Sequence, residues 1–200
     1  MNGYDSSLGD PQKFDPAAAK QLLQKAGVTA ADLSKFKLLT RDTTGNKTVN
    51  QFISQQWQDN LGANIAVDVV DSKTVTSRIR KGQFDIYGPD GWGADYPDQQ
   101  DWFDIFTSAA CHSLNWGCVN MPGYDALVQK ADSTKSDSDR NPLYKQAQKQ
   151  LIDTANVGFI YQQAEYNLIR PYVQNLTITG IDDQYIPGDL YYHDVFISKH

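Results

Sequence analysis

The sequence predicts an α/β fold in which a mixed, mostly parallel sheet is flanked by helices and followed by a β-rich tail. Three observations support this prediction. Strand-like and helix-like segments alternate through the first half of the chain, as crossover connections between parallel strands require. Helical periodicity then dominates as far as Asp153. Beyond Pro171, short alternating segments are separated by glycine, proline and aspartate, which indicates strands and turns.

The first helix is expected to begin after Phe14 and to end at Gly27. Asp15 can cap its N-terminus, and Pro16 suits its first turn because that position needs no backbone donor. A strand is expected next, over 35–41.

Two further crossover units complete the predicted sheet. The first is a helix over 48–61, with apolar residues at intervals of three and four, and then an alternating strand over 64–70. The second is a short helix over 71–81, ended by Gly82, and a strand over 84–87. The residues expected on the better-buried face of the alternating strand are Ile65, Val67 and Val69.

Helices dominate the part of the chain between the sheet and the tail. They are expected over 99–108, 122–132 and 137–153, with a loop over 111–118. An apolar strand is expected over 157–161. The tail is expected to hold strands over 176–179 and 191–198 and no further helix.

The composition excludes several classes of partner. The chain has 24 acidic residues against 18 Lys and Arg, and it has no basic cluster to replace the counterions of a nucleic acid. No run of about 18 apolar residues could span a bilayer, and the first residues lack the layout of a signal peptide. We therefore expect no nucleic-acid partner, and we expect any export signal to lie outside these residues.

The segment over 85–104 is the strongest pointer to function. It contains six aspartates and no lysine or arginine, so its formal charge equals the net charge of −6 of the whole chain. It leaves the end of a predicted strand, and α/β sheets bind ligands beyond the carboxyl ends of their strands. The helical spacing of Asp98, Asp101 and Asp104 indicates structural roles for these three, near a helix N-terminus.

Asp95 differs from the later aspartates because it lies in the sequence Gly-Trp-Gly-Ala-Asp-Tyr-Pro. Gly93 allows a ligand to approach the backbone closely, and Trp92 offers a flat apolar face. A carboxylate beside an aromatic ring suits an ammonium group, which it binds through a charge-assisted hydrogen bond and cation–π attraction.

Cys111 and Cys118 are the only cysteines. Their spacing is too wide for a redox CxxC motif, and they lack partners for a zinc site, so a disulfide is favoured. Such a bond would pin a loop with little core of its own and would place the protein in an oxidising compartment. The alternative is a pair of free thiols in a cytosolic protein. His112 is interpreted as a solvated loop residue rather than a ligand.

The motifs of common enzymes are missing. The chain has no GxSxG elbow, Walker loop, GxGxxG or HExxH, and its aspartates do not have the spacing of a calcium loop. A hydrolase that uses paired aspartates is the less favoured alternative, because acidic residues in such a stretch more often cap and solvate helices and turns. We therefore expect no catalytic residues, no cofactor and no metal site.

Several segments together resemble the bacterial oligopeptide- and dipeptide-binding proteins, the extracytoplasmic solute receptors of ABC importers. They are FDPAAAKQLLQKAG at 14–27, GQFDI at 82–86, GWGADYP at 91–97 and YDAL at 124–127. The ending DVFISKH at 194–200 resembles the last strand of oligopeptide receptors in that family. The resemblance covers nearly the entire chain.

The resemblance implies a periplasmic-binding-protein-like lobe. Residues 1–162 would form the C-terminal lobe of a two-lobed receptor, and residues 163–200 would return across the hinge toward the missing N-terminal lobe. Tyr161 and Gln163 would lie at this crossing and contribute to the cleft. The implied partners are a peptide or another small solute, the missing lobe and an ABC transporter permease. The implied location is extracytoplasmic, with membrane contact only through an upstream lipid anchor.

The tail should pack on a neighbour, because the lobe that it would normally cover is absent. We expect it to dock on this chain or on a second copy of it.

By the same resemblance, Asp95 would hold the α-amino group of a peptide and Trp92 would flank the pocket. Backbone groups around Gly93 and Ala94 would pair with the peptide as with an added strand. Such backbone pairing reads the side chains of the peptide only weakly.

One departure from the family pattern concerns the carboxylate end of the ligand. Some receptors carry a basic residue a few positions before the tryptophan, where this chain has Pro89 and Asp90. A fixed peptide length is therefore not expected. A carbohydrate receptor of the same architecture is the alternative, and a neutral sugar would need Trp92 more than Asp95.

Overall fold

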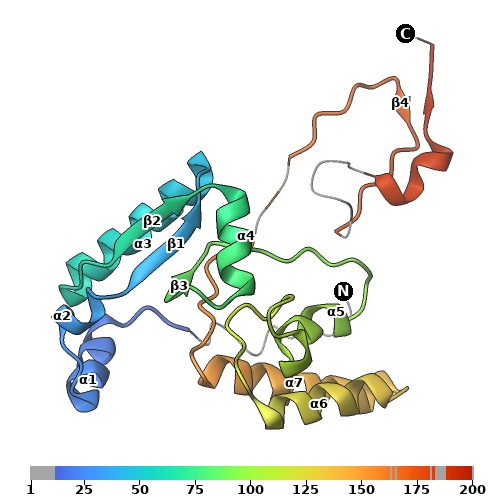
Figure 1. The fold of residues 1–200 in the computed structure, drawn as a ribbon. Coiled ribbons are helices and arrows are strands. Elements are labelled where there is room, and N and C mark those ends of the chain that lie inside the picture. The colour runs from blue at the N-terminus through green and yellow to red at the C-terminus, as the bar shows by residue number, and fades with distance from the viewer. Residues whose placement is uncertain (1–11, 163, 165, 181, 183–187, 200) are drawn as a thin grey trace.

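The computed structural model describes residues 12–162, 164, 166–180, 182 and 188–199, which form an α/β body and a C-terminal segment (Figure 1). The body contains a three-stranded sheet in the order β2-β1-β3. Both pairings are parallel, which confirms the predicted crossover topology. The strands are β1 (Lys37–Arg41), β2 (Ala66–Val70) and β3 (Ile86–Tyr87).

The central strand is covered on both faces. Leu38 packs against α3 (Thr44–Leu61), and the next residue, Leu39, packs against Ile79 of α4 (Ser72–Arg80). Because successive strand residues point to opposite faces, two adjacent leucines serve two separate cores. The sheet is thus the middle layer of an α/β/α sandwich (Figure 1).

The first helix has the predicted boundaries. α1 (Pro16–Ala26) begins after Asp15, whose carboxylate accepts a hydrogen bond from the Ala18 N–H at 2.8 Å. It ends at Gly27, whose φ of +69° is a left-handed conformation that glycine adopts at little cost. A short helix, α2 (Ala30–Leu33), leads from there to β1.

A helical layer with its own core lies beside the sheet (Figure 1). α6 (Pro122–Ser133) and α7 (Asp137–Asp153) form a hairpin, and α5 (Gln100–Phe103) packs against both. In the described part of the chain, no helix is long and apolar enough to cross a membrane. The buried residues of this layer are Met121, Tyr124, Val128, Ala147 and Leu151.

The helix predicted over 99–108 is broken. α5 stops at Phe103, and the side-chain amide of Asn115 donates hydrogen bonds to the carbonyls of Phe106 and Thr107, each at 3.1 Å. The hydroxyl of Tyr124 also donates a hydrogen bond to the carbonyl of Phe103 at 2.6 Å. A helix that continued to residue 108 would need that carbonyl for the N–H of Thr107. The segment instead forms two short 3₁₀ helices, η2 (Asp104–Phe106) and η3 (Ser108–Ala110).

The C-terminal segment has less strand than predicted. β4 (Val173–Gln174) pairs antiparallel with β5 (Phe196–Ile197), and a 3₁₀ helix, η4 (Asp189–Asp194), replaces part of the strand predicted over 191–198. Residues 176–179 form no strand. Figure 1 shows β4 and η4 apart from the body, so these described elements of the tail do not dock on this chain as expected.

Two further strand predictions are wrong. Residues 157–161 are irregular, and the side-chain amide of Gln12 forms hydrogen bonds with the carbonyl of Val157 and the N–H of Phe159. Val69 is 39% exposed, although the alternation predicted it on the buried face. β2 is an edge strand, with β1 as its only neighbouring strand among the described residues, and an edge strand is less completely covered than a central one.

Candidate functional site

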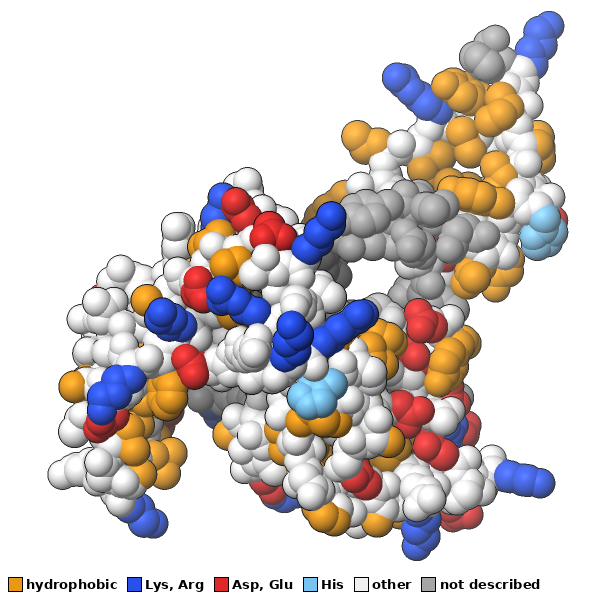
Figure 2. Space-filling model, in the orientation of Figure 1, with side chains coloured by type: hydrophobic (Ala, Val, Ile, Leu, Met, Phe, Trp, Pro, Cys, Tyr) orange, Lys and Arg blue, Asp and Glu red, His pale blue; other side chains and the backbone are white. Residues whose placement is uncertain are grey.

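The acidic loop, defined here as residues 88–99, lies at the carboxyl ends of the parallel strands. β1 ends at Arg41 and β3 at Tyr87, and the chain passes through a cis peptide bond between Gly88 and Pro89 into the loop. Figure 2 shows acidic side chains gathered on the part of the surface that contains the loop and α5. This is the place where α/β sheets bind their ligands.

Asn50 anchors the start of the acidic loop. It lies in α3, is fully buried, and donates a hydrogen bond from its side-chain amide to the carbonyl of Gly88 at 2.6 Å. This role was not identified from the sequence. The signal was a polar residue on the apolar stripe of a helix, three and seven positions before Ile53 and Trp57.

One buried carboxylate organises the Gly-Trp-Gly-Ala-Asp segment. Asp101 lies in α5 and is only 6% exposed. Its Oδ2 atom accepts hydrogen bonds from the indole Nε1 of Trp92 at 3.2 Å and from the backbone N–H of Asp95 at 2.7 Å. Asp101 therefore fixes the indole edge of one predicted ligand-binding residue and the backbone of the other.

The carboxylate of Asp95 itself is available. The residue is exposed, and its side chain has no hydrogen-bond or ion-pair partner among the described residues. A Cβ atom built at Gly91 or Gly93 would meet no atom within 4 Å, so the backbone beside Trp92 borders open space. Ala94, by contrast, is buried, so the segment is packed against the protein at this residue. The arrangement presents a negative group, an aromatic ring and accessible backbone together.

Asp98 ties the end of the acidic loop to α7. Its two carboxylate oxygens each accept a hydrogen bond from the guanidinium of Arg140 at 2.6 Å, and one also accepts the N–H of Gln100 at 2.8 Å. The hydrogen bonds from Arg140 hold the pKa of Asp98 below its usual value. Bidentate pairs of this kind are the strongest of the charge-assisted hydrogen bonds. Asp98 has the structural role predicted for it.

Arg41 brings a cation to the acidic loop, which was not anticipated. Its Nη1 atom donates a hydrogen bond to Asp90 at 3.3 Å, and its guanidinium lies 5.6 Å from the ring centroid of Tyr87. The Tyr87 hydroxyl donates to the other oxygen of Asp90 at 2.9 Å, and burial raises the pKa of Tyr87, which keeps this hydroxyl protonated. The signal in the sequence was a basic residue at the carboxyl end of a predicted strand.

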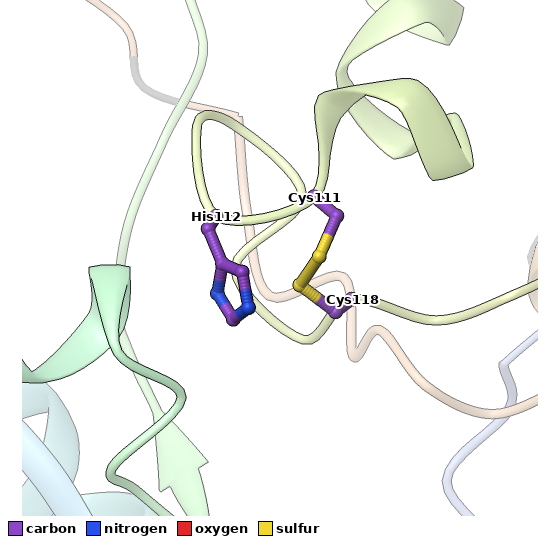
Figure 3. Close-up of side chains that lie close together, drawn as sticks. All are labelled: Cys111, His112 and Cys118. Carbon is purple, nitrogen blue, oxygen red and sulfur yellow. A yellow bond between two sulfur atoms is a disulfide. The ribbon is translucent and has the colours of Figure 1, made fainter.

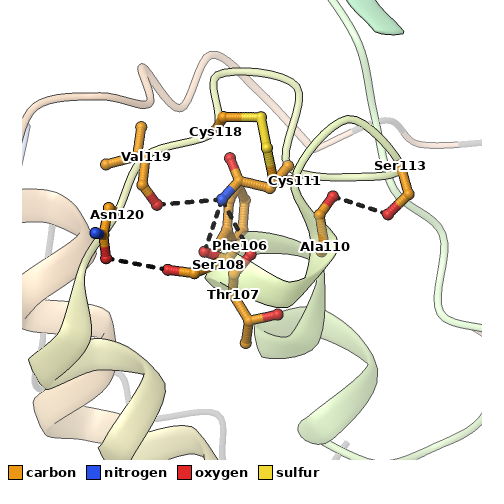
Figure 4. Close-up of a disulfide and its surroundings, with 10 residues drawn as sticks. Phe106, Thr107, Ser108, Ala110, Cys111, Ser113, Cys118, Val119 and Asn120 are labelled. Atoms are coloured by element: carbon orange, nitrogen blue, oxygen red, sulfur yellow. Dashed lines mark hydrogen bonds between the residues drawn. A yellow bond between two sulfur atoms is a disulfide. The ribbon is translucent and has the colours of Figure 1, made fainter.

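The remaining predicted residues have separate outcomes. Cys111 and Cys118 form the predicted disulfide, beside the ring of His112 (Figure 3) and among the hydrogen bonds of the adjacent segments (Figure 4). Tyr161 is 64% exposed in an irregular segment, and no hydrogen bond joins it to the acidic loop in the part of the chain that the structure describes. Gln163 lies outside the described residues.

Comparison with known families gives a match over the first half of the chain. The family model described as bacterial extracellular solute-binding proteins, family 5 Middle, matches residues 1–113. Among curated proteins, the periplasmic murein peptide-binding protein MppA of Escherichia coli is 28% identical over 92% of this chain and 33% of its own length. The probable deoxycholate-binding periplasmic protein YgiS of Escherichia coli is 28% identical over 96% of this chain and 36% of its own length.

Solved structures show the same fold. The structure of Escherichia coli MppA superposes with a TM-score of 0.76 over 92% of this chain, at 27% identity, and 35% of that chain is covered. Haemophilus influenzae OppA in complex with the peptide RPPGFSPFR superposes with a TM-score of 0.72 over 92% of this chain, at 25% identity, with 35% of that chain covered. The chain thus spans about a third of the length of the relatives that it matches.

Proposed function

Because the chain belongs to family 5 of the bacterial extracellular solute-binding proteins, we propose that it is part of a receptor that binds peptides for an ABC importer. Relatives named as peptide-binding proteins and the OppA structure with a bound peptide support this class of ligand. The relatives are binding proteins, so we infer that this chain binds its solute without transforming it.

We propose that Asp95 binds the α-amino group of the peptide. The observation that carries this proposal is that two aspartates of this segment have different environments. The buried carboxylate of Asp101 holds the Trp92 indole and the Asp95 backbone, which leaves the Asp95 side chain exposed and without a partner among the described residues. An ammonium group there would gain a charge-assisted hydrogen bond, with the Trp92 ring beside it.

The backbone around Gly93 and Ala94 would pair with the extended peptide. The open space at Gly93 supports this, since an approaching strand needs access to backbone groups. Arg41 would serve the negative end of a ligand, because a peptide carboxylate could compete with Asp90 for its guanidinium. Tyr161 and Gln163 would border the same cleft from the crossing segment.

In this proposal, residues 1–162 are the C-terminal lobe of a two-lobed receptor, and residues 163–200 run toward the other lobe. The exposed apolar side chains of the C-terminal segment support such a contact, because Tyr166 and Leu168 are almost fully exposed in this chain. The further partners would be an ABC transporter permease and, through an upstream lipid anchor, the membrane surface. The periplasmic relatives support an extracytoplasmic location.

Calorimetric titration of a two-lobed receptor that carries these residues would test the role of Asp95. Asp95→Ala should weaken binding of an unmodified peptide by about 2 kcal/mol or more, because the ammonium group loses its charged partner. N-acetylation of the peptide should cost a similar amount in the original receptor and little in the variant. Asp59→Ala is the matched control, because Asp59 is an exposed aspartate near the C-terminus of α3, at the opposite end of the sheet.

Equal peptide affinity in the Asp95→Ala receptor would refute the proposed amino-group contact. Binding of a neutral sugar that depends on Trp92 and not on Asp95 would favour a carbohydrate receptor instead. Deoxycholate has a carboxylate and no amine, so its binding should be insensitive to Asp95→Ala. Recovery of the peptide intact after incubation would confirm that binding is not followed by hydrolysis.

A further inference from the structure

Three hydrogen-bond donors surround the side chain of Asp90, near the start of the acidic loop. Its Oδ1 atom accepts hydrogen bonds from the Nη1 atom of Arg41 at 3.3 Å and from the backbone N–H of Gly91 at 3.1 Å. Its Oδ2 atom accepts a hydrogen bond from the Tyr87 hydroxyl at 2.9 Å. A guanidinium, a phenol and a backbone N–H thus bind both oxygens of one carboxylate.

The sheet positions two of these donors. Leu39 of β1 pairs in register with Tyr87 of β3. Arg41 lies two residues after Leu39, and alternate residues of a strand point to the same face. The guanidinium of Arg41 accordingly lies 5.6 Å from the ring centroid of Tyr87. The carboxyl ends of two neighbouring strands therefore hold the guanidinium and the phenol, independently of the acidic loop.

The contact between Arg41 and Asp90 is open to solvent. Their side chains are 27% and 37% exposed, and ion pairs as exposed as this contribute little to stability. The acidic loop is also held by hydrogen bonds of Asn50, Asp98 and Asp101 that do not involve Arg41. Another carboxylate could therefore replace that of Asp90 without releasing the rest of the loop.

Asp90 occupies the position that a ligand carboxylate would take. A peptide ends in the same chemical group as the aspartate side chain, and a guanidinium binds this group through charge-assisted hydrogen bonds. While Asp90 is in place, the charge of Arg41 is already paired. A second carboxylate that approached would meet the negative charge of Asp90, and like charges in a binding site oppose binding.

We propose that Asp90 is a specificity-determining residue, an internal carboxylate that withholds Arg41 and Tyr87 from the C-terminal carboxylate of the ligand. This inference rests on the proposed function, in which Asp95 binds the amino group of a peptide. It refines the role proposed for Arg41, because a ligand carboxylate gains this contact only when Asp90 loses it. A receptor of this kind is indifferent to the C-terminal charge of its ligand, which agrees with the expectation that peptide length is not fixed.

Matched pairs of free-acid and C-amidated peptides would test the proposal, by calorimetric titration of a two-lobed receptor that carries these residues. Asp90 and Asp95 are five residues apart, and five residues of chain span at most about 18 Å. An extended peptide rises about 3.3 Å per residue, so peptides of about two to seven residues cover every separation that the acidic loop permits.

In the original receptor, the two forms of each peptide should bind within about threefold of each other, because Asp90 already pairs the guanidinium. Asp90→Asn removes the charge and keeps one acceptor oxygen. In this variant, the free acid should bind at least about tenfold more tightly than the amide at one or more lengths, because Arg41 has no other carboxylate there. The preference should disappear when Arg41→Gln is added to Asp90→Asn. Asp59→Asn is the matched control for the loss of one negative charge, because Asp59 is exposed and lies in α3.

A small carboxylate tests the three donors without a peptide. Asp90→Ala removes the internal carboxylate and keeps the guanidinium, the phenol and the backbone N–H. Acetate should therefore raise the thermal unfolding temperature of the Asp90→Ala chain, whereas acetamide, which has the same shape and no charge, should not. Neither compound should stabilise the original chain, because Asp90 fills the position.

Two results would overturn this proposal and leave the proposed function in place. One is equal affinity for free acid and amide at every length in the Asp90→Asn receptor, while Asp95→Ala still weakens peptide binding. The other is a failure of acetate to stabilise Asp90→Ala, which would show that the three donors do not form a carboxylate site. A receptor that binds no peptide at all would refute the proposed function itself, and this inference with it.

Discussion

The Oδ2 atom of Asp101 accepts a hydrogen bond from the backbone N–H of Asp95 at 2.7 Å. The two aspartates are six residues apart, and they have opposite environments, since Asp101 is buried and Asp95 is exposed. The buried carboxylate of Asp101 therefore holds the backbone that carries the exposed carboxylate of Asp95. This relationship distinguishes the structural carboxylate, Asp101, from the candidate contact residue, Asp95.

Asp101→Ala should lower the free energy of unfolding of the chain by about 1–3 kcal/mol, because the Asp95 N–H and the Trp92 indole lose their acceptor. It should also weaken peptide binding to a two-lobed receptor, although Asp101 would not touch the ligand. Urea denaturation and calorimetry measure the two effects. Asp101→Asn keeps one acceptor oxygen and should lie between the original chain and the alanine variant. Unchanged peptide affinity in Asp101→Ala would show that the hydrogen bonds of Asp101 to Trp92 and Asp95 do not affect peptide binding.

The pair formed by Asp98 and Arg140 predicts a loss of stability in acid. The pKa of Asp98 is lowered in the folded chain, so its contribution is fully present above the unfolded value of 3.8 and is lost as the pH falls through the folded value. Asp98→Asn should cost about 1 kcal/mol near neutral pH, a modest figure because the pair is partly exposed.

Urea denaturation of both proteins across this range would check the prediction. The difference between Asp98→Asn and the original chain should shrink below pH 3.8, where the Asp98 carboxyl group takes up a proton in the unfolded chain before it does so in the folded chain. Asp59→Asn is the control for a general charge effect. A difference that is constant with pH would exclude the ion pair as its cause.

Asp104 predicts the opposite behaviour. Burial, followed by the negative charge of Asp132, raises its pKa above 3.8, so the ionised form destabilises the folded chain at neutral pH. Asp104→Asn should therefore stabilise the chain by less than about 1 kcal/mol at neutral pH, since the group is partly exposed. The gain should vanish below pH 3.8, where the carboxyl is protonated in both the folded and unfolded states. Thermal unfolding at several pH values would measure it, and a loss of stability at neutral pH would contradict it.

Local signals in the sequence were sufficient for the α/β body. The caps at Asp15 and Gly27 and the alternation of strands and helices depend on neighbouring residues, so they predicted α1 and the parallel sheet. The helix over 137–153 was correct at both ends because its pattern is long. Long periodic segments leave few alternatives for local structure.

Contacts between distant residues explain what the sequence could not predict. The break after Phe103 coincides with a hydrogen bond to the carbonyl of that residue from the hydroxyl of Tyr124, which lies 21 residues later in the sequence. The strand expected over 157–161 has the right composition, but it has no neighbouring strand among the described residues. A strand needs a partner, and its composition does not provide one.

The candidate site could be predicted only in part, because some of its contacts also join residues that are distant in the sequence. Glycine, tryptophan and aspartate in one short motif identified Asp95 and Trp92 from local sequence. Asp101 was expected to have a structural role, but its hydrogen bonds to Trp92 and Asp95, and the contact of Arg41 with Asp90, form only when the loop folds back on α5 and β1. Hydrogen-bond partners across such distances have no periodic signal.

Two buried polar side chains, Thr40 of β1 and Asn50 of α3, lead to the last prediction. The Oγ1 atom of Thr40 and the Oδ1 atom of Asn50 are buried and have no hydrogen-bond partner among the described residues. Thr40→Val should keep the shape of the β1 side chain and remove an unsatisfied hydroxyl, so it should stabilise the chain by up to about 1 kcal/mol. Asn50→Ala should instead destabilise it by about 2–3 kcal/mol, because the Gly88 carbonyl loses its donor at 2.6 Å and a cavity forms. Urea denaturation compares the two variants. A clear loss of stability in Thr40→Val would contradict the prediction and would mean that the Thr40 hydroxyl is hydrogen-bonded to water in solution.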